Sequence, residues 1–561
     1  MTILDQAKQH IFEKLIELIG NDSLINDIVI DYPPQNDWGD LTVACFVLAK
    51  IHKCSPADMA KDLASKLSSD AVIDKIEAKG PYLNFFLKNN LLFQVVDESL
   101  KKDCGFSQEH SSERIMIEYS NANTHKEYHV GHLRNICYGD SVASLFLANG
   151  YKVDRVSYIN DFGIHAAKTL WQFKKNQNSI EGGYVLGRLY SEASRALEDN
   201  ETGKAEVAEI MKQIEDRNGD DYKLWQETRR WSIDYFDDIY NRLKIKFDQV
   251  YYESEVIDEG RELVFKLLER GVLQKSQGAV IADLSQYDLG VLVFLRSDGT
   301  ALYPVGDLAL ASKKFSKTNL SQSLYVVDVR QSLYFQQLFK VLELAGYQTK
   351  MVHLVYDFVK LPQGAMSSRL GLVVSFDEVY QEAKNKIVSE ITKRHQDWSD
   401  KKIEQTAEAM TIGVLKFEMI KVGADKIITF NINEALRFDG FTSVYLQYTG
   451  ARINSLLKKG HYKFDSHLSL AILTEAKERE LILFLSKFTE NIKEATRRYE
   501  PSILAKYLFD LSRVFNDYYQ TSPIIQDNQD LQNARLTLVA SVLQVLTNGL
   551  AILGIAIIEE M

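Results

Sequence analysis

The sequence has few cysteines and no long hydrophobic run. Only four of its 561 residues are cysteine, Cys45, Cys54, Cys104 and Cys137, and no two of them form a C-x-x-C pair. This pattern predicts neither a disulfide framework nor a structural zinc site. No apolar stretch approaches the roughly 20 residues of a membrane-spanning helix, and the first residues lack the basic and apolar regions of a signal peptide. We therefore expect a cytoplasmic protein with no membrane partner.

Positive charge is not in excess either. Lysine and arginine number 66 against 77 acidic residues, which gives a net charge of -11. Contact with nucleic-acid phosphates needs local clusters of lysine and arginine. An acidic chain can still carry such a cluster on one face, so the charge tilts only slightly against a nucleic-acid partner. The length predicts about three to five domains.

The sequence does contain a distinctive motif between a strand and a helix. Residues 113–119 predict a short buried strand, and residues 133–148 predict a helix that ends at an Asn-Gly stop signal. His129 and His132 lie three residues apart at the helix start, where both rings can face one pocket. Gly131 between them lets a phosphate approach the backbone. Because helix N-termini favour anions, we interpret the motif as a nucleotide site in which both imidazoles donate hydrogen bonds to phosphate oxygens.

Two other interpretations of the motif stay open at this point. A structural role ranks second, because His-x-Gly-His is short enough to recur by chance. Zinc binding ranks third, since His125, His129 and His132 would line one face of a continuous helix at spacings of four and three. Gly131 disfavours that helix, and the strand–loop–helix layout leaves His125 outside it. We therefore expect no protein-bound metal.

A second strand makes the motif part of a doubly wound domain. Residues 153–158 predict this strand, so that strand, helix and strand form a βαβ unit with a parallel sheet. The strand ends in Asn160-Asp161-Phe162-Gly163, where polar groups of such folds bind ligands, although Asp161 could also simply cap a helix. The charged helical block at about 176–290 predicts an insertion, after which the sheet resumes with a strand at 291–296.

The segments on either side have a different character. The N-terminal block, with an expected helix at 41–51, predicts an α+β domain, and its aromatic strand begins with Tyr82, which could stack on a base. From about residue 376 onward the sequence predicts helices only. Aromatic and basic residues on a helical bundle can bind single-stranded RNA by stacking, worth about 1–3 kcal/mol per base, although packing in a core is the commoner role of such residues.

Taken together, these stretches resemble the class I aminoacyl-tRNA synthetases, and among them the arginyl-tRNA synthetase family. His129-Val130-Gly131-His132 is similar to the HIGH motif of the class, and Gly364-Ala365-Met366-Ser367-Ser368-Arg369 is similar to its KMSKS loop. The resemblance specific to arginine covers several further stretches: Ser120 to Arg134, Asn160 to Gly163, Ser297-Asp298-Gly299-Thr300 with Tyr303 and Asp307, and the helix beginning Val444-Tyr445-Leu446-Gln447-Tyr448.

The resemblance implies the fold and the reaction. The fold would be multidomain α/β, with an N-terminal α+β domain that touches the tRNA elbow (1–108), a class I Rossmann-like catalytic domain with a helical insertion (109–375), a helical connection (376–438) and an all-α anticodon-binding bundle (439–561). L-arginine would be activated by ATP to arginyl-adenylate and then transferred to the terminal adenosine of tRNA(Arg). Mg²⁺ would accompany the ATP, and we expect a monomer.

The resemblance also implies residue roles. The catalytic residues would be His129, His132, Lys126 and Arg369, and ATP would further contact Gly131, Met366, Ser367 and Ser368. The arginine substrate would be held by Asn123, Glu253, Tyr303, Asp307 and Gln331. The tRNA would contact Tyr82, Asn84, Tyr445, Tyr448, Arg452, Tyr519 and Met561.

Two departures from the family pattern carry predictions. Ala365 and Ser368 stand where the KMSKS loop has lysines, so the missing charge must come from elsewhere. Lys126, three residues before His129, is the better candidate. We expect its loss to impair adenylate formation more than the loss of Arg369. In addition, Val305-Gly306 replaces the Thr-Arg that usually precedes the arginine-binding aspartate. The alternative function is a non-catalytic paralogue that binds tRNA or a metabolite, but the intact histidine motif favours the enzyme.

Overall fold

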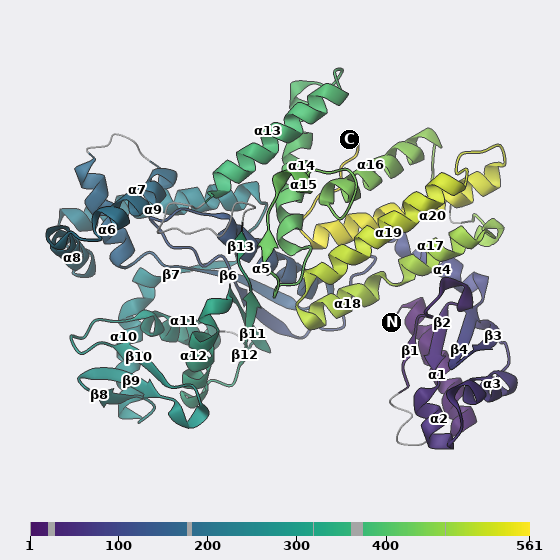
Figure 1. The fold of residues 1–561 in the computed structure, drawn as a ribbon, viewed down its shortest axis with the longest axis horizontal. Helices are drawn as coiled ribbons and strands as arrows, with labels where there is room; N and C mark the ends of the chain where they lie inside the picture. Colours follow the sequence, from purple (N-terminus) through teal and green to yellow (C-terminus); the bar gives the residue numbers. More distant parts are fainter. Residues whose placement is uncertain (1, 21–27, 177–181, 318, 361–373, 466) are drawn as a thin grey trace.

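The computed structural model describes residues 2–20, 28–176, 182–317, 319–360, 374–465 and 467–561. Figure 1 shows an N-terminal domain set apart from a central α/β domain by a bundle of long helices. The glycine-bounded loop at 364–371 lies outside the described residues. The expectations for Ala365, Met366, Ser367, Ser368 and Arg369 therefore have no structural counterpart.

The N-terminal domain is built on an antiparallel sheet of four strands in the order β1-β2-β4-β3. The segment expected as one helix at 41–51 is instead a strand followed by a helix, because its first residues pair with β4 and bury their apolar side chains there. The elements are α1 (Ile3–Ile19), β1 (Ile30–Asp31), η2 (Asn36–Trp38), β2 (Leu41–Ala44), α2 (Phe46–His52), α3 (Pro56–Lys66), β3 (Ile73–Lys79), β4 (Tyr82–Leu87) and α4 (Asn89–Ser99).

The central domain is built on a parallel sheet of five strands in the order β12-β11-β5-β6-β7. Its strands are β5 (Arg114–Glu118), β6 (Lys152–Ile159), β7 (Gln249–Tyr252), β11 (Gln322–Asp328) and β12 (Lys350–Tyr356). The predicted strand–helix–strand unit is confirmed, with α5 (Val130–Ala148) as the crossover between β5 and β6. The chain moves outward from β5 in both directions, and ligands of such sheets bind where the order reverses, at the carboxyl ends of the strands.

The insertion is shorter than the sequence predicted. The sheet resumes at β7, which pairs with β6, whereas residues 291–295 form β10 of a separate antiparallel sheet with β8 and β9. The sequence predicted a strand before Tyr251 but assigned it to the insertion, because its pairing with β6 leaves no local pattern. The remaining elements are α6 (Ile164–Lys175), α7 (Gly183–Ala196), α8 (Glu201–Glu215), α9 (Asp220–Arg242), α10 (Glu253–Glu269), β8 (Gln274–Ser276), β9 (Ala279–Asp283), η3 (Ser285–Tyr287), β10 (Val291–Leu295), α11 (Tyr303–Lys317), η4 (Val329–Gln331) and α12 (Ser332–Leu344).

The C-terminal region is helical, as predicted, apart from the pair of two-residue strands β13 (Val359–Lys360) and β14 (Ile428–Thr429). Its helices are α13 (Phe376–Arg394), α14 (Asp400–Ile420), α15 (Ile432–Ala435), α16 (Ser443–Lys459), η5 (Leu470–Ile472), α17 (Ala476–Ser486), α18 (Phe488–Arg498), α19 (Pro501–Thr521) and α20 (Gln529–Ile552). By length and composition α20 could cross a membrane, but 78% of its apolar window is buried, as in a core helix of a soluble protein.

The N-terminal domain docks on this bundle through α17 and α4 (Figure 1). Arg479 on α17 forms an ion pair with Asp40 and donates a hydrogen bond to the Leu87 carbonyl at 3.0 Å. Asp40 is buried, so loss of Arg479 would leave a buried carboxylate without its cationic partner at this contact. The same guanidinium donates to Asn89 at 2.6 Å, which fixes the N-terminal domain on the bundle.

Candidate active site

The two signature histidines begin α5 and are locked by its backbone. The His129 Nδ1 atom accepts a hydrogen bond from the Gly131 N–H at 3.0 Å, and the His132 Nδ1 atom accepts one from the His129 N–H at 3.2 Å. The ring centroids lie 3.9 Å apart at an interplanar angle of 31°. A neutral imidazole that accepts through Nδ1 carries its proton on Nε2. Both rings therefore keep an Nε2–H donor for a ligand.

The imidazoles are held neutral. Burial, and secondarily Lys126 and Arg330, lower the pKa of His129 to about 4. Burial, His129 and Lys126 lower the pKa of His132 well below its usual range. Each ring is only partly exposed, so a protonated ring would hold its charge in a largely buried position. The positive charges of Lys126 and Arg330 further disfavour protonation of His129. At neutral pH the pair acts as hydrogen-bond donors, and the positive charge at the site comes from its lysine and arginine neighbours.

His125 does not share this pocket. It is fully buried, with Nδ1 2.9 Å from the Thr124 hydroxyl and Nε2 2.8 Å from the Thr228 hydroxyl of α9. No group of three His, Cys, Asp or Glu side chains within the described residues could hold a metal ion. The zinc interpretation of the three histidines is therefore not supported by their geometry, and His125 instead joins the signature loop to the insertion.

Helix α7 of the insertion supports Lys126. The Lys126 ammonium lies 5.1 Å from the centroid of the Tyr190 ring, a distance at which a cation is attracted by the ring. One turn earlier, a Cβ atom on Gly187 would lie 2.6 Å from the Glu127 backbone nitrogen, so glycine is needed for this close packing. Burial, and secondarily Lys168, lower the pKa of Lys126. No sequence pattern indicated Tyr190, because it is 64 residues from Lys126 and in a helix without a motif.

The residues that directly follow position 373 contact the histidine segment. His129 pairs with Ser375, the Phe376 N–H donates to the Tyr128 carbonyl at 2.8 Å, and the Val130 N–H donates to the Val374 carbonyl at 3.4 Å. On the other side of the loop at 364–371, Arg134 of α5 donates to the Asp357 carbonyl at 2.6 Å. Both flanks of the loop are thus bonded to the segment that carries the HIGH-like motif.

A second cluster, at the starts of α10 and α11, is acidic. Glu253 is buried, and within the described residues its Oε2 atom has no hydrogen-bond partner. Burial, with Asp161 and Asp307, raises its pKa to about 9. Asp307 accepts a hydrogen bond from the Tyr334 hydroxyl, and burial raises its pKa to about 6. A buried carboxylate without a partner is costly, so this cluster is suited to a cationic ligand.

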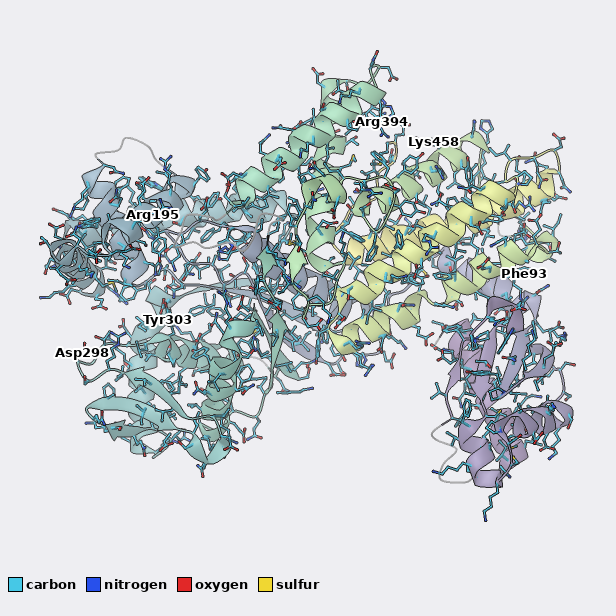
Figure 2. All side chains as sticks on the ribbon, in the orientation of Figure 1. Phe93, Arg195, Asp298, Tyr303, Arg394 and Lys458 are labelled. Atoms are coloured by element: carbon cyan, nitrogen blue, oxygen red, sulfur yellow. The ribbon has the colours of Figure 1, made fainter. Side chains whose placement is uncertain are left out.

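The other residues expected at the arginine site lie on three different segments. Tyr303, labelled in Figure 2, begins α11 and is 65% exposed. Asn123 bridges to Asn160 at the carboxyl ends of β5 and β6. Gln331 is exposed at the end of η4, which follows β11. Asn123 and Gln331 thus follow β5 and β11, the two strands at which the strand order reverses, whereas Tyr303 is on the helix that carries Asp307.

Asp161 has a structural role. It is fully buried, accepts hydrogen bonds from the Ser254 N–H at 2.9 Å and the Ser254 hydroxyl at 2.7 Å, and forms an ion pair with Arg229 of α9. With these partners its carboxylate is satisfied. It ties the end of β6 to the start of α10 and thereby positions Glu253, the residue before Ser254.

In the N-terminal domain, Tyr82 and Asn84 have different environments. Tyr82 lies in an aromatic group with Trp38 and Phe46, at centroid distances of 5.8 and 6.4 Å. Phe46 is 54% exposed, so the group reaches the surface. Asn84 is fully buried and its Oδ1 accepts a hydrogen bond from Thr42 at 2.7 Å. The prediction that the Asn84 side chain contacts tRNA is therefore wrong, because no atom of this side chain is exposed. β4 is a central strand, and the side chain instead stabilises the sheet.

The residues of α16 that were expected to contact tRNA pack against α19. Arg452 donates to Asn516 at 2.7 Å and to the Tyr448 hydroxyl at 3.1 Å, and its guanidinium lies 5.3 Å from the Tyr519 ring centroid. Tyr445 packs on Phe509 at 5.4 Å and its hydroxyl accepts from Asn516 at 3.0 Å, so it is more a packing residue than a surface one. Met561 lines a small cavity with Arg394 and Phe438, next to α13.

The sheet order, the helix start with its two imidazoles and the appended helical bundle define a class I aminoacyl-tRNA synthetase. Residues 95–430 match the family model "tRNA synthetases class I (R), catalytic domain". Residues 5–87 match "Arginyl tRNA synthetase N terminal domain", and residues 446–561 match "DALR anticodon binding domain". The chain belongs to the arginyl-tRNA synthetase family.

Similar proteins agree over the full length. The chain is 36% identical to an arginine–tRNA ligase of Bdellovibrio bacteriovorus, with 94% of this chain and 93% of that one covered. It is 31% identical to an arginine–tRNA ligase of Halothermothrix orenii, with 98% and 99% covered. Among solved structures, the arginyl-tRNA synthetase of Thermus thermophilus is similar with a TM-score of 0.82 and 27% identity, covering 98% of this chain and 100% of that one.

Proposed function

We propose that His129, His132 and Lys126 promote the activation step of an arginine–tRNA ligase. The carboxylate oxygen of arginine attacks the α-phosphorus of ATP, the bond to the β-phosphate oxygen breaks, and pyrophosphate leaves. The observation that carries the proposal is the pair of backbone hydrogen bonds that leave both imidazoles with Nε2–H donors at a helix N-terminus. Such fixed donors stabilise charge that develops on phosphate oxygens.

Lys126 supplies positive charge beside these donors. Its positive charge contributes to the lowered pKa of both histidines, which supports a role beside them. Since Ala365 and Ser368 carry no charge, Lys126 takes over the part that lysines of the KMSKS-like loop would play. Arg330 is a further cation near His129, and the bonds from both flanks of that loop to the histidine segment are consistent with ATP binding there.

Glu253 and Asp307 receive the guanidinium of arginine. A planar guanidinium presents five N–H donors that match carboxylates in pairs. Tyr303 covers the open side of this pocket, and Asn123 and Gln331 hold the amino-acid end of the substrate. A pocket that hydrogen-bonds a guanidinium can reject substrates lacking it by about 10⁴–10⁵-fold, which makes a separate editing domain unnecessary.

Mg²⁺ would neutralise charge on the ATP triphosphate. The two histidines and Lys126 are poor ligands for this ion, which prefers oxygen donors and keeps several waters. No group of three His, Cys, Asp or Glu side chains in the described part of the chain is arranged to hold a metal ion, so the ion would be held mainly by phosphate oxygens and water. The protein residues at the site would bind the phosphates directly.

The tRNA surfaces lie on the two outer domains. Tyr82, with Trp38 and Phe46, supplies stacking rings for the tRNA elbow, and Tyr448, Arg452 and Tyr519 supply rings and a cation for the anticodon region. Tyr445, Asn84 and Met561 support these surfaces from below. We expect the enzyme to act as a monomer in the cytoplasm.

The test is charging of total tRNA by the purified chain, with each labelled amino acid offered separately together with ATP and Mg²⁺. We expect charging with arginine alone. A folded protein that binds tRNA but charges it with no amino acid would instead support the non-catalytic paralogue, for which the altered KMSKS-like loop is the only feature in favour. Charging with another amino acid would show that the assignment of Glu253 and Asp307 is wrong.

A further inference from the structure

Gly306, directly before Asp307 on α11, is crowded by a tyrosine from the neighbouring strand. A Cβ atom on Gly306 would lie 2.5 Å from the Tyr158 hydroxyl oxygen and 3.7 Å from Cγ of Glu253. The first distance is well inside van der Waals contact, so any other side chain at this position must displace Tyr158. Position 306 therefore lies beside both Tyr158 and Glu253 of the acidic cluster, and its glycine leaves space for the phenol.

The Tyr158 hydroxyl has an incomplete set of partners. Tyr158 lies near the end of β6, and its N–H donates to Asn121 at 3.2 Å. Burial, then the nearby carboxyl groups of Glu253, Asp307 and Asp161, raise the pKa of Tyr158 well above its usual value. The side chain is half-buried, and its hydroxyl donates no hydrogen bond in the described part of the chain, so the hydroxyl is free to bind a polar ligand. A polar group that enters this pocket would provide a hydrogen-bond partner.

We infer that the Tyr158 hydroxyl is a specificity-determining contact to the guanidinium of arginine, and that Gly306 is required to admit it. This inference rests on the proposed arginine pocket. Glu253 and Asp307 supply carboxylate oxygens on two sides of the pocket, and Tyr334 already occupies one oxygen of Asp307. The Tyr158 oxygen accepts a further guanidinium N–H, while its own O–H donates to a carboxylate. A guanidinium has enough N–H donors for three acceptors of this kind.

Helices α10 and α11 pack closely at Val305, the residue before this glycine. A Cβ atom on Gly260 of α10 would lie 2.2 Å from the Val305 carbonyl oxygen, so α10 and α11 pack with their backbones nearly in contact. Val305 is fully buried in this contact. Glu253 at the start of α10 is thereby held at a fixed distance from Asp307, and the sequence Val305-Gly306 in place of Thr-Arg fits a pocket narrowed by Tyr158.

The test is a double-mutant cycle of the full-length chain: wild type, Tyr158→Phe, Gly306→Ala and the double variant. Arginine and ATP KM values are measured by pyrophosphate exchange in the presence of tRNA. Loss of a hydrogen bond to a charged group predicts that Tyr158→Phe raises the arginine KM by about tenfold and leaves the ATP KM unchanged. Overpacking predicts that Gly306→Ala lowers kcat/KM for arginine by about 100-fold, a larger loss than that of Tyr158→Phe. Removing the hydroxyl from this variant should restore kcat/KM to the level of Tyr158→Phe.

Tyr251→Phe is the matched control. Tyr251 is the register partner of Tyr158 on β7, and its ring packs against the apolar cluster of Met116, Val156 and Leu320. It loses the same hydroxyl and should keep the wild-type arginine KM. Thermal unfolding of all five proteins checks that each is folded, and should Gly306→Ala not fold, the KM of Tyr158→Phe decides alone.

Three results would overturn the inference: an unchanged arginine KM in Tyr158→Phe, wild-type activity in Gly306→Ala, or a double variant no better than Gly306→Ala. Asp307→Asn separates these results from failure of the pocket itself. If Asp307→Asn raises the arginine KM and Tyr158→Phe does not, only the role of Tyr158 is wrong. If neither does, the arginine pocket lies elsewhere.

Discussion

Glu253 makes arginine binding depend on pH in a way that can be worked out from the structure. Burial raises the pKa of this carboxyl to about 9, so that in the free enzyme at pH 7 about 1% of it is anionic. Forming the anion that pairs with a guanidinium then costs about 2.7 kcal/mol, at 1.36 kcal/mol for each of two pH units. The dissociation constant for arginine should therefore fall about tenfold per pH unit from pH 7 to about 8.5.

The assay is isothermal titration calorimetry of arginine binding, with tRNA present, in two buffers of different ionisation enthalpy. Near pH 7.5 each bound arginine should release close to one proton. Because the amino group of arginine also titrates toward pH 9, the comparison is with Glu253→Gln, which should bind arginine weakly and with much less proton release. Equal proton release by the two proteins, or a wild-type affinity that is flat from pH 7 to 8.5, would refute the reasoning.

Three further predictions follow from the site and the tRNA surfaces. Without arginine, Glu253→Gln should have a higher melting temperature than wild type at pH 8.5, because a carboxyl with a raised pKa destabilises the fold as pH rises from about 4.5 to 9; equal melting curves would contradict this. Lys126→Ala should slow tRNA-dependent pyrophosphate exchange more than Arg369→Ala, and comparable losses would show that the loop arginine shares the role. Tyr82→Leu should raise the KM for tRNA several-fold and leave pyrophosphate exchange at saturating tRNA unchanged, since only a stacking ring is lost. An unchanged KM would show that the tRNA elbow does not bind at Tyr82.

Parts of the fold could be predicted from local sequence patterns alone. The strand at 114–118, the helix that follows it and the next strand were expected within a few residues, because apolar periodicity and an Asn-Gly stop signal are properties of adjacent residues. The same holds for the all-helical region after 376. A strand before Tyr251 was expected, but its place beside β6 in the parallel sheet was not, because pairing between distant segments leaves no local pattern. The segment at 41–51 was assigned wrongly as one helix for the same reason, since its strand pairs with β4.

For the site, the sequence by itself determined which residues form the HIGH-like motif and that a family resemblance extends over the whole chain. Tertiary structure decided the rest. The tautomers of His129 and His132 depend on backbone N–H groups that point at their Nδ1 atoms, and the structural role of Asp161 depends on partners that are 68 and 93 residues away. Glu253 and Asp307 meet only because α10 and α11 pack closely at Gly260. Their pKa values follow from the burial that this packing creates, and no local pattern in a sequence encodes burial between distant segments.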